Sequence, residues 1–459
     1  MKKIYFSLFI TAVFVIFSSC TENKNLNNID IIDDIDNINN IDITEGEIKE
    51  MKSNVYPVMY WYGPPIMDEK AVKEIAAAGF TRVPAEGKDK EDNIRIIKLF
   101  ANEGIEAMVS DRRIYEAIKK DPAGREKLLK EVVGDYREFE NLKAYYITDE
   151  PSYNDFEALG DVCAALKRLD PDRESYINLF PNYANSEQLG TSTYKKHIDL
   201  YVDIVKPSII SYDHYHFVGR GLENKKADNE SARDKLIRES AWNTSERAGF
   251  FDNIEVIRDK SLETKIPFMV IILLVEHGPY RNLSEAEIRW EVFQSLAYGS
   301  SRISYFTYGT PDYEENWRYI NGMVNTEGRI TRHYYEVMRI NKDLKLVGSY
   351  LADKKSIGVY HIGEEKDKTV KYFDPSKNLG NITDIRTTGG LTMGFFDSGE
   401  ILIANKDYLG VNKIDITVGT MKRVSVMDKS TGEWYKLEKT DNVCTLTLMP
   451  GDGELIKIP

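Results

Sequence analysis

Between residues 55 and 345, short apolar runs alternate with amphipathic stretches of helical period, and this alternation constrains the fold more than any other feature. Parallel strands need a crossover connection, which is usually a helix. The predicted strands cover 55–62, 80–84, 105–110, 142–148, 174–179, 208–212, 267–275 and 303–308. The predicted helices cover 69–78, 91–103, 124–139, 153–169, 192–205, 250–264, 284–298 and 334–346.

Eight such repeats over about 290 residues favour a closed (β/α)8 barrel, which we place at residues 51–346. The alternative is a doubly wound open sheet. No Gly-rich phosphate loop of the GxGxxG or P-loop type follows any predicted strand, which weakens a nucleotide-binding open sheet further.

The segment 347–459 has a different pattern. Short runs with alternating polarity, such as SIGVYHI, EILIANK and KIDITV, are separated by turn signals such as Asp397-Ser398-Gly399 and Ser430-Thr431-Gly432. Strands at this spacing are typical of two packed antiparallel sheets. We therefore predict a C-terminal all-β sandwich domain after the barrel.

The N-terminus has the layout of a secretory signal. Lys2 and Lys3 precede an apolar run, and two small residues precede Cys20, as in a bacterial lipoprotein box. We predict a lipoprotein signal peptide over 1–20, lipidation at Cys20, and a flexible Asn/Asp/Ile-rich tether over 21–50. The expected location is the cell envelope, at the periplasmic or the surface face of the outer membrane, with a lipid anchor at Cys20. A plain signal peptide or an N-terminal anchor helix is the alternative.

Composition excludes several classes of protein. A net charge of -13 argues against a nucleic-acid partner, which needs a basic face. Three cysteines among 459 residues exclude a disulfide scaffold and a cysteine-built zinc site. The 28 tyrosines and 5 tryptophans fit a sugar-binding surface, although an ordinary core also uses them.

In a (β/α)8 barrel the active site lies at the carboxyl ends of the strands. The residues that directly follow or end each predicted strand are therefore the candidates for a site. They are Trp61, Tyr62, Glu86, Asp111, Asp149, Glu150, Asn182, Tyr183, Asp213, His214, Tyr215, Glu276, His277 and Tyr308.

This predicted mouth is acidic and aromatic, so it fits a limited set of ligands. Crowded carboxylates suit a metal ion, the hydroxyls of a sugar, or a developing positive charge. Glycoside cleavage uses the last of these, because two carboxylates flank an oxocarbenium-like centre. Crowding also raises the pKa of one carboxyl, which can then hold a proton at neutral pH. The residues alone leave a metal-dependent hydrolase open, with Asp213, His214 and His216 as conceivable ligands.

The barrel-plus-sandwich layout and the phrases YYITDEPS and LAYGSSRISYFTY resemble the clan A glycoside hydrolases, in particular proteins of gut Bacteroidetes related to the family 42 beta-galactosidases. The resemblance implies a retaining glycosidase that acts on an oligo- or polysaccharide without a cofactor. It also implies that Glu150, at the end of strand four, is the acid/base. Glu276, at the end of strand seven, would be the nucleophile.

The sequence departs from this clan at two places. Asp149 stands where the clan usually has Asn, and the added charge should raise the pKa of Glu150. Little around Glu276 fixes its direction; if it turned outward, Asp213 or Glu86 could supply the second carboxylate. These departures motivate a rival hypothesis, a carbohydrate-binding lipoprotein whose barrel has lost catalysis.

Overall fold

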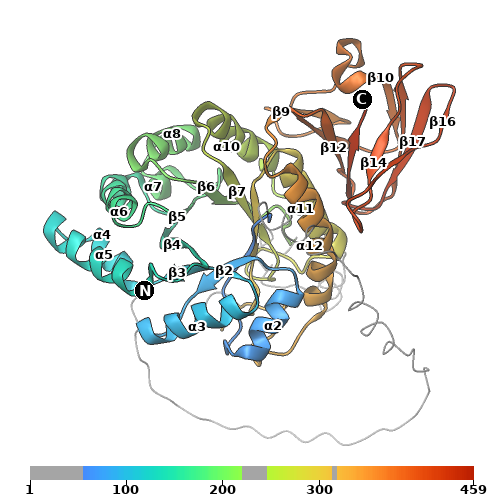
Figure 1. Cartoon of the computed structure of the whole chain (residues 1–459). Coiled ribbons are helices and arrows are strands. Elements are labelled where there is room, and N and C mark those ends of the chain that lie inside the picture. Colours follow the sequence, from blue (N-terminus) through green and yellow to red (C-terminus); the bar gives the residue numbers. More distant parts are fainter. Residues whose placement is uncertain (1–54, 220–244, 313–317) are drawn as a thin grey trace, which may run out of the picture. The chain divides into compact units, whose positions relative to one another are not determined.

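The computed structural model describes residues 55–219, 245–312 and 318–459 (Figure 1). The predicted signal peptide, the tether and Cys20 lie outside the described residues, as does most of the polar stretch 218–246. In the described ranges, no helix is both long enough and apolar enough to span a bilayer.

Eight parallel strands form the first sheet, in the order β1-β8-β7-β6-β5-β4-β3-β2. They are β1 (Val58–Trp61), β2 (Arg82–Ala85), β3 (Glu106–Ser110), β4 (Leu142–Asp149), β5 (Glu174–Leu179), β6 (Ile210–Asp213), β7 (Phe268–Leu273) and β8 (Arg302–Phe306). The two end strands meet where the amide of Thr81 donates to the carbonyl of Val58 at 3.0 Å. The predicted (β/α)8 barrel is confirmed (Figure 1).

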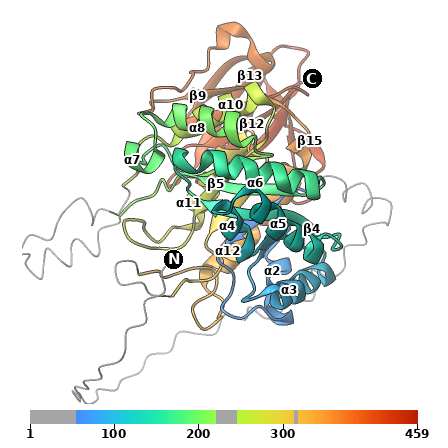
Figure 2. The same ribbon diagram turned by 90° about the vertical axis from the view of Figure 1, so that its left-hand side faces the viewer.

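Helices surround the barrel, and each predicted helix is present. They are α2 (Glu69–Ala77), α3 (Lys90–Asn102), α5 (Pro122–Tyr136), α6 (Phe156–Leu169), α8 (Tyr194–Val205), α10 (Phe250–Thr264), α11 (Glu285–Ala297) and α12 (Arg332–Leu351). The sequence reading missed two short helices, α4 (Arg112–Ile118) and α7 (Ser186–Leu189). Their apolar positions are too few to show a period. Helices α6 and α8 pack side by side outside the strands (Figure 2).

Local sequence signals explain where these helices begin. A capping box starts α11: the side chains of Ser284 and Glu287 each accept a hydrogen bond from the other residue's backbone amide. Asp68 and Asp89 cap α2 and α3 in the same way, with one side-chain acceptor each. The closing helix, predicted to end at 346, continues to Leu351.

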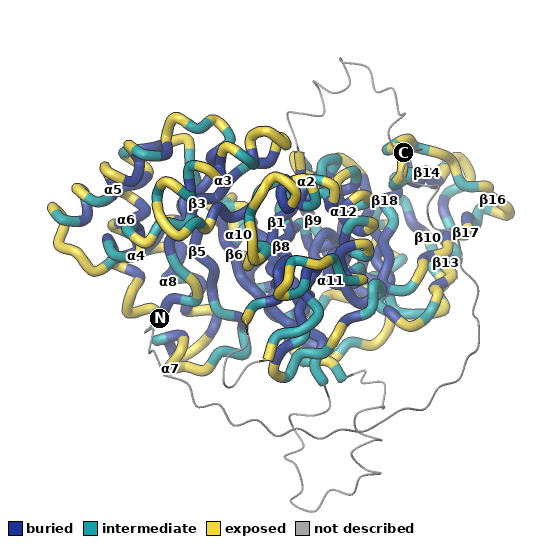
Figure 3. The backbone as a smooth tube through the Cα atoms, turned by 90° about the horizontal axis from the view of Figure 1, so that it is seen from below, coloured by how far each residue is buried: buried dark blue, intermediate teal, exposed yellow. Residues whose placement is uncertain are grey.

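The amino-terminal end of the barrel is closed by an ion network. Arg82 binds Glu106 at 2.7 Å and Glu174 at 3.1 Å, and Arg302 binds Glu174 at 2.5 Å. Above this network, an apolar layer that includes Met59, Met108, Ala144, Tyr176, Met269 and Ile271 fills the lumen. The strands are largely buried, whereas the outer faces of the helices are exposed (Figure 3). The remaining open end is the mouth at the carboxyl ends of the strands.

The C-terminal part forms two antiparallel sheets, β10-β13-β17-β16 and β15-β14-β18-β12-β11-β9, around a second apolar core. The strands are β9 (Ser356–Ile362), β10 (Ile382–Thr387), β11 (Leu391–Phe396), β12 (Glu400–Asn405), β13 (Asn412–Val418), β14 (Ser425–Met427), β15 (Trp434–Lys436), β16 (Lys439–Thr440), β17 (Val443–Leu448) and β18 (Gly453–Lys457). The predicted all-β domain is confirmed. Strand β10 was missed because its side chains are mostly half-buried or exposed.

A carboxylate joins this β domain to the barrel. Asp367 lies between β9 and β10 and accepts hydrogen bonds from two amides at the start of α10, those of Gly249 at 2.7 Å and Phe251 at 2.6 Å. In return, Asp252 accepts from the amides of Lys368 and Thr369, both at 2.9 Å. The bonds to Asp367 satisfy amides at the start of α10 that would otherwise lack partners.

Candidate active site

Asp149 and Glu150 end β4 at the barrel mouth. The backbone of Glu150 has a φ of 44°, in the left-handed region, and its amide donates to the carbonyl of Asn178 at 2.9 Å. Neither acid caps the next helix, since Asp155 is the N-cap of α6. Non-glycine residues held in this conformation concentrate at functional sites, because the surrounding structure must offset the strain.

The two acids differ in their affinity for a proton. Burial raises the pKa of Asp149 to about 6, although a hydrogen bond from Asn178 opposes the rise. Burial, and then the neighbouring charge of Asp149, raise the pKa of Glu150 to about 7. The Asp149 side chain is exposed at the end of β4, but the protein atoms around it still reduce its contact with bulk water. Near neutral pH, Asp149 is therefore mainly ionised while Glu150 holds a proton about half of the time.

Asn178, on β5, joins this pair to a third acid. Its Nδ2 donates to Asp149 at 3.0 Å and to Asp213, at the end of β6, at 3.2 Å. Its Oδ1 accepts from Ser211 at 2.9 Å, and Ser211 contacts the hydroxyl of Tyr176, also at 2.9 Å. Burial, followed by the charges of Glu150 and Asp149, raises the pKa of Asp213 well above its ordinary value, which favours its protonated form.

The sequence reading missed Asn178 because it took only residues at or beyond the predicted strand ends. Side chains alternate between the two faces of a strand, so Glu174, Tyr176 and Asn178 share one face of β5. Glu174 belongs to the ion network in the barrel. A polar side chain on this inward face, two positions beyond a buried tyrosine, was the signal available in the sequence.

Aromatic side chains line the mouth. The ring of Trp61 lies 5.7 Å from that of Tyr146 and 6.5 Å from that of Tyr176. The ring of Tyr215 lies 5.4 Å from that of Phe306. Burial is the largest cause of the raised pKa of Tyr215, followed by Asp213 and Tyr183, and the charges of Asp149 and Glu150 add to it. These two groups of rings therefore flank the acids. Tyr62, which is 43% exposed, stands at the rim.

Glu86 follows β2 and lies among the same aromatic residues. Burial raises its pKa. In turn, the charge of Glu86 is a minor cause, after burial, of the raised pKa values of Tyr62 and Tyr146. Because Tyr146 also responds to the charges of Asp149 and Glu150, Glu86 belongs to the acidic mouth.

Glu276 has other partners. Asn321 donates to its Oε2 at 3.0 Å. Burial raises the pKa of Glu276, and Asn321 and the charges of Arg318 and Arg332 lower it; no mouth acid contributes. The next residue, His277, contacts the rings of Tyr215 and Phe306. Since neighbouring side chains in extended backbone point to opposite sides, Glu276 is directed away from that aromatic surface.

Four other predicted site residues are engaged inside the protein. Asp111 caps α4 and is bound by Arg113 and Tyr136. Asn182 donates to the carbonyl of Gly249 at 2.9 Å. Burial lowers the pKa of His214 to about 3, and its Nδ1 lies 3.2 Å from Asn253. Tyr308 is fully buried against Tyr60 and Phe80. These contacts hold the fold together, and we carry none of the four into the proposed chemistry.

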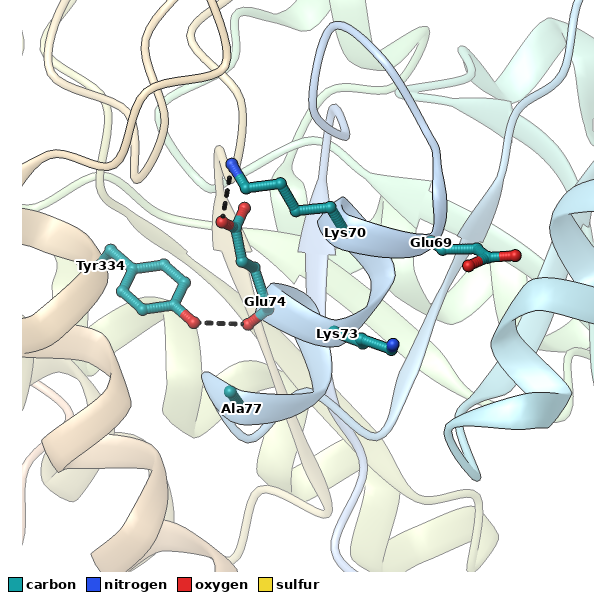
Figure 4. Close-up of a pocket in the computed structure, with 6 residues that line it drawn as sticks. All are labelled: Glu69, Lys70, Lys73, Glu74, Ala77 and Tyr334. Atoms are coloured by element: carbon teal, nitrogen blue, oxygen red, sulfur yellow. Dashed lines mark hydrogen bonds and ion pairs between the residues drawn. The ribbon is translucent and has the colours of Figure 1, made fainter. Parts of the chain in front are cut away.

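A separate hollow lies on the outer surface between α2 and α12, lined by Glu69, Lys70, Lys73, Glu74, Ala77 and Tyr334 (Figure 4). There, the hydroxyl of Tyr334 donates to the carbonyl of Glu74 at 2.7 Å, and Lys70 pairs with the Glu74 carboxylate at 3.1 Å. The hollow includes none of the mouth acids. Within the described ranges, no group of three or more His, Cys, Asp or Glu side chains is arranged to hold a metal ion.

Solved structures with a similar barrel fold include glycoside hydrolases. A family 5 glycoside hydrolase from Bacteroides vulgatus superposes with a TM-score of 0.53 at 10% identity, over 88% of this chain and 89% of that one. A beta-galactosidase from Bacillus circulans sp. alkalophilus gives 0.51 at 9% identity, over 88% and 99%. No family model matches the sequence, and no curated protein does. At such identities, the likeness establishes the fold alone.

Proposed function

We propose that this protein is a glycoside hydrolase that cleaves an O-glycosidic bond, with Glu150 as the general acid. The observation that carries the proposal is the pair of adjacent acids at the end of β4. Glu150 has a pKa of about 7 beside Asp149, whose pKa is about 6. A general acid is most effective when its pKa lies near the working pH. Environments that separate the pKa values of two carboxyls are typical of acid and base roles.

The neighbouring groups suit sugar binding. The protonated form of Asp213, which burial favours, can donate a hydrogen bond to a sugar hydroxyl, whereas ionised Asp149 can accept one. The faces of Trp61 and Tyr62 offer apolar surface against which a sugar ring can pack. Because one structural likeness is to a beta-galactosidase, β-galactosides belong in the first substrate panel.

For the nucleophile we propose Glu276, as the resemblance to clan A implies. Burial raises the pKa of Glu276, but the charges of Arg318 and Arg332 oppose that rise and favour the ionised form that attack requires. The pKa of Asp213 is raised well above its ordinary value, which favours its protonated form instead. This role requires the side chain of Glu276 to turn from Asn321 toward the mouth.

Azide rescue tests whether Glu276 or Asp213 is the nucleophile, since azide replaces a missing carboxylate nucleophile. If Glu276 is the nucleophile, Glu276→Gln is inactive but forms a glycosyl azide, while Asp213→Asn does not. Rescue of Asp213→Asn alone would assign the role to Asp213.

A second candidate function is non-catalytic carbohydrate binding. It is favoured by the contacts of Glu276, which leave β7 without an acid beside Glu150. Calorimetric titration with the glycans of the substrate panel distinguishes the two functions. Binding without product release, unchanged in Glu150→Gln, would establish this second function in place of hydrolysis.

We also propose that a lipid on Cys20 anchors the protein in the cell envelope. The support is the sequence pattern of the first 20 residues alone. Cell fractionation with mass spectrometry of the mature N-terminus tests it. The anchor is expected to be lost in Cys20→Ala, and an unmodified Cys20 in the wild-type protein would refute it.

A further inference from the structure

Arg247 lies against the aromatic side of the mouth without an acidic partner. The centre of its guanidinium is 3.9 Å from the centroid of the Tyr183 ring and 5.5 Å from that of Tyr280. Its Nη2 donates to the Tyr280 hydroxyl at 3.3 Å. Within the described residues, no carboxylate lies within 4.0 Å of this guanidinium, even though Glu246 precedes it in the chain; Glu246 accepts from Tyr408 instead.

This leaves donors of Arg247 unused. Its Nε is buried and has no hydrogen-bond partner in the part of the chain that the structure describes. By contrast, other half-buried arginines in the protein are paired: Arg281 with Glu287, and Arg302 with Glu174. Stacking on a ring occupies the face of a guanidinium, whereas its N–H donors lie in the plane and stay available for a planar anion. The contacts with Tyr183 and Tyr280 thus orient the group without neutralising it.

Tyr183 connects this arginine to the acids. The charge of Asp213 raises the pKa of the Tyr183 hydroxyl and that of Arg247 lowers it, after the larger effect of burial, so both charges lie near one ring. The hydroxyls of Tyr183 and Tyr280 are 3.5 Å apart. The backbone fixes the position as well, because the amide of Arg247 donates to the carbonyl of His216 at 2.7 Å. A glycan whose scissile bond lies beside Glu150 would bring a neighbouring sugar unit within reach of this side chain.

We propose that Arg247 binds an anionic group, a carboxylate or a sulfate, on the glycan substrate, and so makes the protein selective for acidic glycans. The inference rests on the proposed function in one respect, that the ligand of the mouth is a glycan. An anion at Arg247 would supply the missing opposite charge. In this arrangement, the Tyr183 ring would lie between the bound anion and the acids of the mouth.

The test is calorimetric titration of the full chain with pairs of glycans that differ only in charge. One pair is oligogalacturonate and its fully methyl-esterified form; another is a sulfated galactan oligosaccharide and its desulfated form. The expected result is at least about tenfold tighter binding of the charged member of one pair. The pair that shows this preference identifies the anionic group as a carboxylate or a sulfate. The preference should weaken as salt increases. Equal affinity for both members of both pairs would overturn the proposal.

Variants identify the residue. Arg247→Gln should abolish the preference, and Arg247→Lys should restore part of it, because lysine keeps the charge without the planar fork. Arg386→Gln is the matched control: it removes the same charge from an exposed position on β10 and should leave the preference intact. An unchanged preference in Arg247→Gln would overturn the assignment. If the protein prefers charged glycans but releases no product, the proposed hydrolysis is wrong and the role of Arg247 stands. If it hydrolyses neutral glycans and shows no charge preference, the role of Arg247 is wrong and the proposed hydrolysis stands.

Discussion

The side-chain amide of Asn178 lies 3.2 Å from the carboxyl of Asp213 on the neighbouring strand. The same nitrogen donates to Asp149 at 3.0 Å, so one amide orients two acids of the mouth. A donor shared in this way favours the ionised form of at least one acceptor. It thereby holds Asp149 ionised beside a Glu150 that retains its proton.

Removing this amide should change the titration of the site. In Asn178→Ala, Asp149 loses the hydrogen bond that opposes the effect of burial, so we expect its pKa to rise above about 6. The acidic limb of the pH–rate profile should move upward, and kcat/KM should fall by about 10-fold or more. Ser304→Ala is a matched control at a buried, inward-facing position on β8, where the hydroxyl has no hydrogen-bond partner among the described residues. An unchanged acidic limb in Asn178→Ala would contradict the role of the amide.

The pH dependence of activity follows from the state of Glu150. A general acid works only when protonated, so activity should fall as pH rises through about 7, the pKa of Glu150. Asp149 should be ionised for activity, which places the acidic limb near its pKa of about 6. Because the two groups interact, the measured values belong to the pair. A profile of kcat/KM that stays flat from pH 5 to 9 would be incompatible with this assignment.

Stability should also depend on the Glu150 proton. The folded state raises the pKa of Glu150 from 4.5 to about 7, so it binds the proton more tightly than the unfolded chain does. The free energy of unfolding therefore falls as pH rises through that window, and the loss is complete above it. Glu150→Gln cannot ionise, so it should be more stable than the wild type at pH 8, by about 1–3 kcal/mol, and differ little at pH 4. Chemical denaturation at both pH values measures the difference in the free energy of unfolding between the variant and the wild type. If the variant were more stable only at pH 4, the expected pH dependence would be wrong.

Asp367 tests how the β domain is held to the barrel. In Asp367→Ala, the amides of Gly249 and Phe251 lose their acceptor, and we expect a loss of about 1–3 kcal/mol in the free energy of unfolding. The mouth acids are not among its contacts, so kcat should stay within about twofold. Asp374→Ala is the control, because Asp374 caps an exposed short helix in the same domain. Equal stability losses in the two variants would argue against a special role for Asp367.

The sequence predicted the architecture well, because the strand and helix periods differ and several long helices, such as α2, α3 and α11, begin at a capping side chain. It located Asp149 and Glu150 through the rule that barrel sites follow the strands. It could not show that Asp111 and Asn182 are engaged by neighbouring elements, since Tyr136 and Gly249 reach them only through the fold. For the same reason, it could not show the direction of Glu276, which Asn321 determines from 45 positions further along the chain.

The most direct test of the account is product release from a glycan panel, compared between the wild-type protein and Glu150→Gln at pH 6 to 7. The panel should contain neutral and acidic oligosaccharides together with aryl β-glycosides. The account predicts release of reducing sugar by the wild type from at least one glycan, and a rate at least about 100-fold lower in Glu150→Gln, since general acid catalysis contributes roughly 10²–10⁴-fold. No release from any glycan by the wild type, or an equal rate in the variant, would contradict it.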